Sequence, residues 1–102
     1  MEQRTLDAIA SPRRREILRL VWDRELSAGE IASHFDVSWP AVSQNLNVLR
    51  RAGLVSERRD GRRRLYRAEP KALGPLATAL REMWRTDLRA LKNEVERSGR
   101  GR

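Results

Sequence analysis

The 102-residue chain contains no cysteine and a single histidine, His34. Without cysteine the protein can form neither disulfides nor thiolate metal sites, and it cannot sense oxidants through a thiol. One histidine cannot build a histidine-rich metal site within one chain. We therefore expect no metal and no cofactor. His34 is more simply explained as an exposed histidine at a helix end than as a pH switch.

Long apolar runs are also missing from the chain. No stretch approaches the ~20 apolar residues that a membrane-spanning helix needs. The first ten residues, MEQRTLDAIA, lack the basic and apolar blocks of a signal peptide. We expect a cytoplasmic, nucleoid-associated protein with no membrane partner. The sequence also shows no nucleophile–base pair and no glycine-rich phosphate loop, so we do not expect an enzyme.

Basic residues are in clear excess, with 22 Lys and Arg against 14 Asp and Glu and a net charge of +8. Such an excess favours a polyanionic partner. Only Lys71 and Lys92 are lysines, however, and a GC-rich genome would produce the same bias towards arginine. The distribution of the charge is therefore more informative than its total.

The spacing of apolar residues predicts helices over residues 3–10, with Leu6 and Ile9 facing inwards, and over residues 12–22. Ser27 with Glu30 predicts a capping box at the start of a third helix, and Ser38 an N-cap at the start of a fourth that ends at Gly53. Residues 36–37 allow only a tight turn between these two helices. The pair thus forms a helix-turn-helix.

Beyond residue 53 the period changes. Residues 54–59 and 63–68 are predicted strands, joined through Asp60-Gly61, and residues 71–96 form a long helix. The predicted fold class is mainly α with a small β-hairpin, a winged helix-turn-helix in a single domain over residues 1–102. Its parts are the helix-turn-helix (26–53), the wing (54–68), two dimerisation helices (1–10 and 71–96) and a frayed tail (97–102).

The fourth helix carries short polar side chains where a solvated helix would favour Lys and Glu. In a helix-turn-helix the second helix enters the DNA major groove, where amide side chains pair with adenine and Ser suits either base type. Ser43, Gln44 and Asn47 meet that description, and Ala41 could approach a thymine methyl. Trp39 has two interpretations that stay open: contact with the DNA backbone, or packing against the third helix.

Arginines gather around the predicted hairpin, in the run ERRDGRRRLYR. We expect Arg62 and Arg63, at its tip, to meet phosphate or a minor groove, while Leu65 and Tyr66 tie the hairpin to the core. A charged edge that only prevents aggregation is the alternative. The predicted DNA-binding residues are Ser27, Ser38, Trp39, Ala41, Ser43, Gln44, Asn47, Arg50, Arg59, Arg62, Arg63 and Arg64.

A second basic cluster, Arg13 to Arg15, lies at the start of the second helix, where it opposes the helix dipole. A nearby phosphate could offset this unfavourable placement, and an accident of the surface explains it equally well. Ser27, with the neighbouring N–H groups at a helix N-terminus, is a modest candidate phosphate site.

The last predicted helix has an apolar stripe too long for the rest of the domain to cover. We interpret the surplus as an interface with a second copy of the chain, aided by the first helix; folding back entirely onto its own domain is the alternative. The predicted interface residues are Leu6, Leu73, Leu76, Leu80, Met83, Trp84, Leu88 and Leu91. A two-fold dimer would present two reading helices to a pseudopalindromic DNA site.

Residues 26–70 resemble the ArsR/SmtB family of bacterial winged-helix repressors. The resemblance is carried by the run S-x-P-x-x-S-x-x-L-x-x-L-x-x-A-G-L-V from Ser38 to Val55, followed by D-G-R-R. It implies a homodimer, dimerisation through the first and last helices, double-stranded DNA as partner, and repression of the protein's own operon.

The chain departs from the metal-sensing members of that family. Their Cys-x-Cys motif is replaced by Ser27 and Gly29, and their last-helix site of Asp, His and Glu is reduced to Asp87 and Glu94. The resemblance therefore implies a regulator that does not respond to metals, with an organic molecule or a protein as the remaining classes of effector. The alternatives to a sequence-specific repressor are an architectural DNA-binding protein of low specificity and a winged helix that binds proteins.

Overall fold

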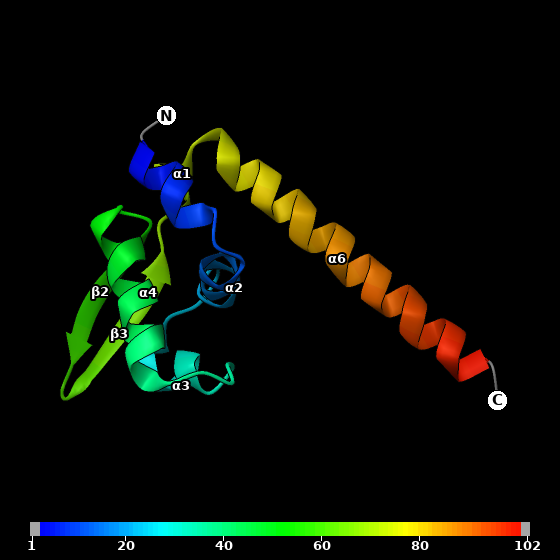
Figure 1. Ribbon diagram of the computed structural model, residues 1–102, viewed down its shortest axis with the longest axis horizontal. Helices are drawn as coiled ribbons and strands as arrows, with labels where there is room; N and C mark the ends of the chain where they lie inside the picture. Colours follow the sequence, from blue (N-terminus) through cyan, green and yellow to red (C-terminus); the bar gives the residue numbers. More distant parts are fainter. Residues whose placement is uncertain (1–2, 101–102) are drawn as a thin grey trace.

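The computed structural model describes residues 3–100, apart from the side chains of residues 90, 91, 94 and 97–100. Along this part of the chain the elements are α1 (Gln3–Ile9), α2 (Pro12–Leu20), β1 (Leu26–Ser27), α3 (Ala28–Ala32), α4 (Trp39–Arg51), β2 (Val55–Asp60), β3 (Arg63–Ala68), α5 (Pro70–Leu73) and α6 (Pro75–Arg100). In Figure 1, α4 lies between the β2–β3 hairpin and α2, and α6 extends away from the other elements. The predicted fold class, mainly helical with a small antiparallel sheet in a winged helix-turn-helix, is confirmed.

Serine side chains begin three of the helices, as predicted. The hydroxyl of Ser11 accepts from the N–H of Arg14 at the start of α2, and that of Ser38 accepts from Ala41 at the start of α4. The capping box at α3 is complete. Each such cap stabilises its helix by about 1 kcal/mol. These local signals explain why the helix starts could be located from the sequence.

The sheet has three strands rather than the expected two. Residues Leu26 and Ser27 form β1, which pairs antiparallel with Tyr66 and Leu65 of β3, and the strand order is β1-β3-β2. A two-residue strand has no periodicity of its own. It exists because β3 offers it a free edge, so the sequence pattern could not reveal it.

The hairpin turns at Gly61-Arg62, one residue later than expected. Asp60 pairs with Arg63, which leaves Gly61 and Arg62 as the two loop residues. Gly61 has φ +65°, and no residue type other than glycine adopts positive φ in the described chain. A two-residue turn with Gly first and negative φ second follows the type II′ pattern, which matches the twist of the strands.

The core gathers side chains from all the helices and the sheet. Its largest fully buried members are Ile17, Leu18, Val21, Ile31, Val42, Leu49, Leu54 and Leu73. Leu65 and Tyr66 are buried, as predicted for the base of the hairpin. In α1 the inward positions are Thr5 and Ala8, whereas Leu6 is 42% exposed, so the predicted inward orientation of Leu6 is wrong.

The predicted last helix is broken near its start. Gly74, with φ +56° and ψ −132°, ends the short α5, and Pro75 begins α6. The Gly-Pro dipeptide is a turn signal that the apolar spacing obscured. Helix α6 continues to Arg100, so residues 97–100 are helical rather than frayed, while residues 101–102 lie outside the described part of the chain.

The predicted dimer residues differ in burial and form three groups. Leu73 and Leu80 are buried in the core of their own protomer, with 2% and 5% exposure, so their assignment to an intersubunit surface is wrong. Leu76 and Trp84 are half-buried against the same core. Leu6, Met83 and Leu88 are exposed, as is Val95, and the side chain of Leu91 lies outside the described residues.

The half-buried Trp84 holds the first part of α6 against the rest of the domain. Its ring meets Trp22 edge to face, with 5.0 Å between centroids, and the guanidinium of Arg81 lies 5.3 Å from the Trp22 ring. The first part of α6 is thus fastened to the end of α2, and the later part presents apolar side chains outwards.

No helix within residues 3–100 is both long and apolar enough to cross a membrane.

Replacing Gly74 by Ala should destabilise the protein by about 1–3 kcal/mol, because an L-residue is strained at this φ and ψ. A Cβ at Gly74 would meet nothing within 4 Å, so the cost is conformational rather than steric. Urea unfolding of the two proteins measures it.

Gly29→Ala is the matched control. Gly29 lies inside α3 with helical geometry, and an added Cβ there would only approach the Ser27 hydroxyl at 3.9 Å. This second substitution should stabilise the protein by about 0.4–1 kcal/mol. Equal effects of the two substitutions would contradict the assignment of Gly74 as the conformational break.

Candidate nucleic-acid interface

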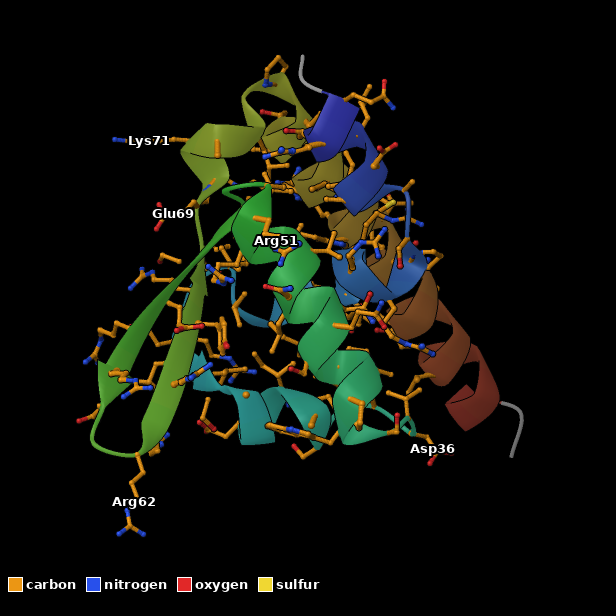
Figure 2. The ribbon with its side chains drawn as sticks, turned by 60° about the vertical axis from the view of Figure 1, so that its left-hand side comes forward. Asp36, Arg51, Arg62, Glu69 and Lys71 are labelled. Atoms are coloured by element: carbon orange, nitrogen blue, oxygen red, sulfur yellow. The ribbon has the colours of Figure 1, made fainter. Side chains whose placement is uncertain are left out.

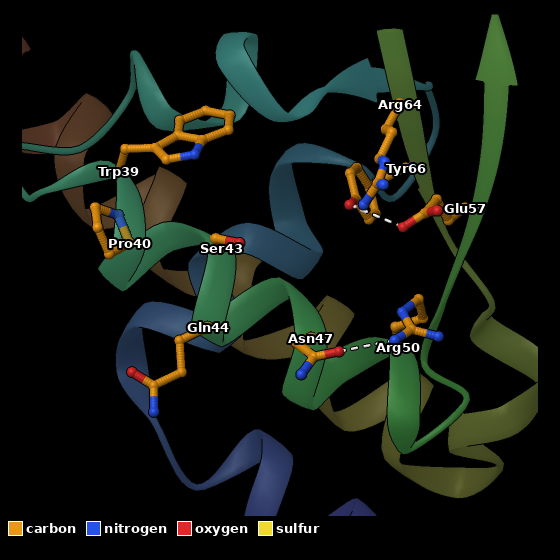
Figure 3. Close-up of a pocket in the computed structure, with 9 residues that line it drawn as sticks. All are labelled: Trp39, Pro40, Ser43, Gln44, Asn47, Arg50, Glu57, Arg64 and Tyr66. Carbon is orange, nitrogen blue, oxygen red and sulfur yellow. Dashed lines mark hydrogen bonds between the residues drawn. The ribbon is translucent and has the colours of Figure 1, made fainter. Parts of the chain in front are cut away.

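Helix α4 has one face in the core and the other in solvent. Val42, Leu46 and Leu49 are at most 2% exposed, whereas Ser43 and Gln44 are exposed. With 3.6 residues per turn, the sequence spacing places Gln44 opposite the buried side of the helix and Ser43 beside it. The Gln44 amide projects away from the helix, on the side remote from the wing (Figure 3). A short, polar, uncovered helix face can enter a DNA groove without steric obstruction.

A groove of about 760 Å³ lies between α4 and the wing. The α4 side supplies Trp39, Pro40, Ser43, Gln44, Asn47 and Arg50, and the wing supplies Glu57, Arg64 and Tyr66 (Figure 3). The structure therefore brings five of the predicted DNA-binding residues of α4 together with one from the wing. Pro40, Glu57 and Tyr66 were not among the predicted site residues.

A second cavity of about 510 Å³ continues from the groove towards α3 and the hairpin tip. Trp39, Ser43, Arg64 and Tyr66 line both cavities, and the second adds Ser27 and the tip residues Arg62 and Arg63. Most of the predicted residues of α4, the start of α3 and the wing thus line two adjoining cavities, whereas Ser38, Ala41 and Arg59 line neither. Together these cavities are hereafter called the α4–wing groove.

Trp39 is 53% exposed and stands on the wall of the α4–wing groove. An indole with this exposure is not fully internal, although it lines the second cavity together with Ala28 and Gly29 of α3; its contact with DNA stays a prediction. Its position in the first turn of α4 follows from the Ser38 cap and from Pro40, which is tolerated there because a first-turn N–H has no helical partner. An exposed indole offers one N–H donor and a flat apolar face.

The register of the hairpin decides which arginines face the groove. Residues directly opposite each other in an antiparallel pair share a face. Arg59 is opposite Arg64 and Glu57 is opposite Tyr66, so these four side chains lie on the face that lines the groove. Arg62 extends from the tip of the hairpin (Figure 2).

Two other wing arginines are held by carboxylates of their own domain. Arg58 binds Glu25 through two hydrogen bonds of 2.8 Å, and Arg63 binds Glu30 at 2.9 Å. The hydrogen bond from Arg58 lowers the pKa of Glu25. Arg63 was expected to be as free as Arg62, but its ion pair fastens the wing to α3.

Ser27 does not offer the phosphate site that was expected. Its N–H donates to the Glu30 carboxylate at 2.9 Å, and its hydroxyl accepts from the Glu30 N–H at 3.1 Å. The backbone hydrogen bond from Ser27 is the main cause of the lowered pKa of Glu30. The capping box therefore occupies this N–H with a carboxylate, which would repel a phosphate.

An acid and a phenol form part of the wing wall of the groove. The Tyr66 hydroxyl donates to Glu57 Oε2 at 3.0 Å (Figure 3). Burial raises the pKa of Tyr66, and the neighbouring carboxylate raises it further, so the hydroxyl remains protonated as a donor. Glu57 was not among the site residues predicted from the sequence, because its place in the groove depends on which face of β2 its side chain occupies. The alternation of side chains along β2 was the available signal.

Near the end of α4, Arg50 is held along its own helix. Its Nη2 donates to Oδ1 of Asn47 at 2.8 Å (Figure 3). The Asn47 Oδ1 already accepts this hydrogen bond, so the Asn47 side chain offers a partner mainly its Nδ2 donor. Gln44, rather than Asn47, is the amide best suited to a bidentate contact with a base edge.

The described residues show no group of three His, Asp or Glu side chains arranged to hold a metal ion. Chemically, the α4–wing groove is lined by hydroxyl and amide groups and an indole from α4 and by arginines from the wing. This combination suits a polyanion whose bases present hydrogen-bonding edges.

Relatives of known class match most of the chain. The family of bacterial regulatory proteins called arsR matches residues 11–57. The HTH-type transcriptional regulator Rv2034 of Mycobacterium tuberculosis is 38% identical over 96 residues, which are 94% of this chain and 90% of that protein. The transcriptional repressor SdpR of Bacillus subtilis is 44% identical over 54 residues, which are 53% of this chain and 60% of the repressor.

A solved structure extends the similarity to the fold. The homodimeric winged helix-turn-helix DNA-binding domain of a Mycobacterium bovis protein superposes with a TM-score of 0.69 at 31% identity, covering 78% of this chain and 74% of that one. The resemblance inferred from residues 26–70 is confirmed. The chain belongs to the arsR family of bacterial regulatory proteins, and its fold is that of a winged helix-turn-helix regulator of transcription.

Proposed function

We propose that the protein is a homodimeric repressor that binds a pseudopalindromic operator, including one upstream of its own gene, without responding to metals. The observation that carries the proposal is the uncovered face of α4, where Ser43 and Gln44 are exposed and line a groove together with Arg64 of the wing. Short polar groups in this position suit the reading of base edges. A regulated response would then depend on an organic or protein effector.

The arginines support the proposal through their placement. Arg59 and Arg64 share the groove-facing side of the hairpin, and Arg62 stands at its tip. Phosphate contacts of this kind position a protein on the duplex, whereas base contacts specify the sequence. In this proposal α4 contacts the base edges and the wing contacts the phosphates.

The apolar surface that remains on α6 supports a dimer. Leu88 and Val95 are 67% and 64% exposed, and Met83 is 36% exposed. Leu88 and Val95, seven residues apart, lie on the same side of α6, and exposed apolar side chains in this arrangement favour a protein partner. The structural relative from Mycobacterium bovis is a homodimer, and the relative from Bacillus subtilis is a repressor. Two copies would place two α4 helices on neighbouring half-sites.

Gln44→Ala should weaken binding to the operator by about 1–3 kcal/mol, because the amide that pairs with a base edge is removed. Binding to random DNA should change little. Titrations of both duplexes at one salt concentration measure the difference. Gln3→Ala, which removes the other glutamine of the chain from the remote helix α1, is the control. Equal weakening on both duplexes would contradict base reading and favour an architectural protein of low specificity.

Arg62→Ala should weaken binding to every DNA sequence and flatten its salt dependence. Removing one phosphate-binding cation should reduce the slope of log K against log salt by about 0.9. Arg58→Ala is the matched control, since it removes the same charge from the same hairpin but from a side chain that Glu25 already holds. A slope that stays the same in Arg62→Ala, or falls equally in both variants, would remove the hairpin tip from the DNA interface.

Leu88→Glu should convert the dimer to a monomer, because a carboxylate cannot be buried without a partner. Operator affinity should fall by about 100-fold or more, since the two half-sites are no longer bound together. Sedimentation velocity measures the assembly. Thr86→Glu adds the same charge two residues away, about 200° around α6, and should leave the dimer intact. A monomeric wild-type protein would refute the dimer outright.

A further inference from the structure

Arg14 joins three helices through its guanidinium group. Its Nε donates to the carbonyl of Ala8 at 2.7 Å and its Nη2 to that of Asp7 at 2.9 Å, both near the end of α1. Its Nη1 donates to Oδ1 of Asn45, in the middle of α4, at 3.2 Å. The Nδ2 of Asn45 in turn donates to the Ala41 carbonyl at 2.9 Å. We call the contact between Arg14 and Asn45 the clasp.

Two members of the basic cluster at the start of α2, Arg14 and Arg15, are thus engaged by the end of α1, whereas Arg13 is exposed. Arg15 donates to the carbonyls of Ile9 and Ala10, at 2.8 and 3.2 Å, and Arg14 donates to those of Asp7 and Ala8. Cations at the C-terminal end of a helix meet its negative dipole end and its unpaired carbonyls. Arg14 differs from Arg15 because its third contact reaches a helix that faces the proposed DNA.

Asn45 is placed where it can control the orientation of α4. It directly follows Gln44 of the exposed face and precedes Leu46 of the buried face, so it stands at the border between them. Beside the clasp, α1 and α4 are separated by a cleft of about 410 Å³, lined by Arg4, Asp7, Val48, Arg51 and Ala52. The clasp is therefore a polar bridge between α1 and α4 at the margin of this cleft.

We infer that Arg14 and Asn45 are positioning residues, which tie the orientation of the reading helix α4 to that of α1. The inference rests on the proposed function. Helix α1 carries the exposed Leu6 and belongs to the proposed dimer surface, so the clasp connects the subunit contact to the DNA contact. Its consequence in the dimer is a fixed relation between the two α4 helices, and hence a fixed spacing of half-sites.

The test compares Arg14→Lys with Arg13→Lys. Both keep the charge, but an ammonium group cannot reproduce the fork that meets three acceptors at once, whereas Arg13 is exposed and makes none of these contacts. Dissociation constants are measured on the operator, on the same operator with one base pair inserted between its half-sites, and on a single half-site. Melting temperatures are recorded for each protein.

In the wild type and in Arg13→Lys, the insertion should weaken binding strongly. In Arg14→Lys, affinity for the native operator should fall by about two- to thirty-fold, the range seen when residues that couple two sites are changed. The penalty for the insertion should shrink by a similar factor, while binding to the single half-site stays within about two-fold of wild type. A residue that only stabilises the fold would lower binding to all three duplexes together.

Asn45 provides a second pair of variants. Asn45→Ala removes the acceptor for Arg14 and should reproduce the reduced spacing selectivity, whereas Asn45→Asp retains an acceptor and should restore it in part. Wild-type spacing selectivity in both Arg14→Lys and Asn45→Ala would overturn the inference, as would uniform weakening on all three duplexes. A wild-type protein that ignores both sequence and spacing would instead overturn the proposed function, and the inference with it.

Discussion

One helix has to serve two environments, and the rest of the structure depends on this constraint. Helix α4 buries Val42, Leu46 and Leu49 almost completely, and this buried side holds it against α2, α3 and the start of the wing. Its other side can remain free of bulky apolar groups only because the buried side anchors it so firmly. The polar face is therefore presented by a rigid element, which is what positioned hydrogen-bonding groups require.

The arginines of the chain divide into those that build the fold and those that remain for a partner. Arg14 and Arg15 bind the carbonyls at the end of α1, and Arg58 and Arg63 bind carboxylates at the base of the wing. These four cations, of which Arg63 lies beside the hairpin tip, are among those engaged within the described structure. The net charge of +8 already counts the carboxylates that pair with Arg58 and Arg63, so the distribution of the remaining cations matters more than the total. Arg59, Arg62 and Arg64 lie on the groove face and tip of the hairpin and make no ion pair within the described residues, so their placement favours phosphate.

Much of the candidate site was predictable because its signals are local. The serine caps located the helices, and the 3.6-residue period separated the groove face of α4 from its core face. Three features were not predictable in this way. The strand β1 needs the edge of β3, the groove position of Glu57 needs the hairpin register, and the clasp joins residues 31 positions apart. Each depends on which distant segment lies opposite, and a local pattern carries no information about that.

The last helix shows the same division. Its apolar spacing correctly indicated more hydrophobic surface than one small domain can cover, but it could not say which leucines the domain uses for itself. Only the break at Gly74 and the contact of Trp84 with Trp22 decided that Leu73 and Leu80 turn inwards while Leu88 turns outwards. The sequence by itself determined the elements, their caps and the polar face of α4, because these follow from neighbours within about four residues. The tertiary structure alone decided which charged side chains bind groups of the same chain and which apolar surfaces remain exposed, because burial depends on how all the elements pack together.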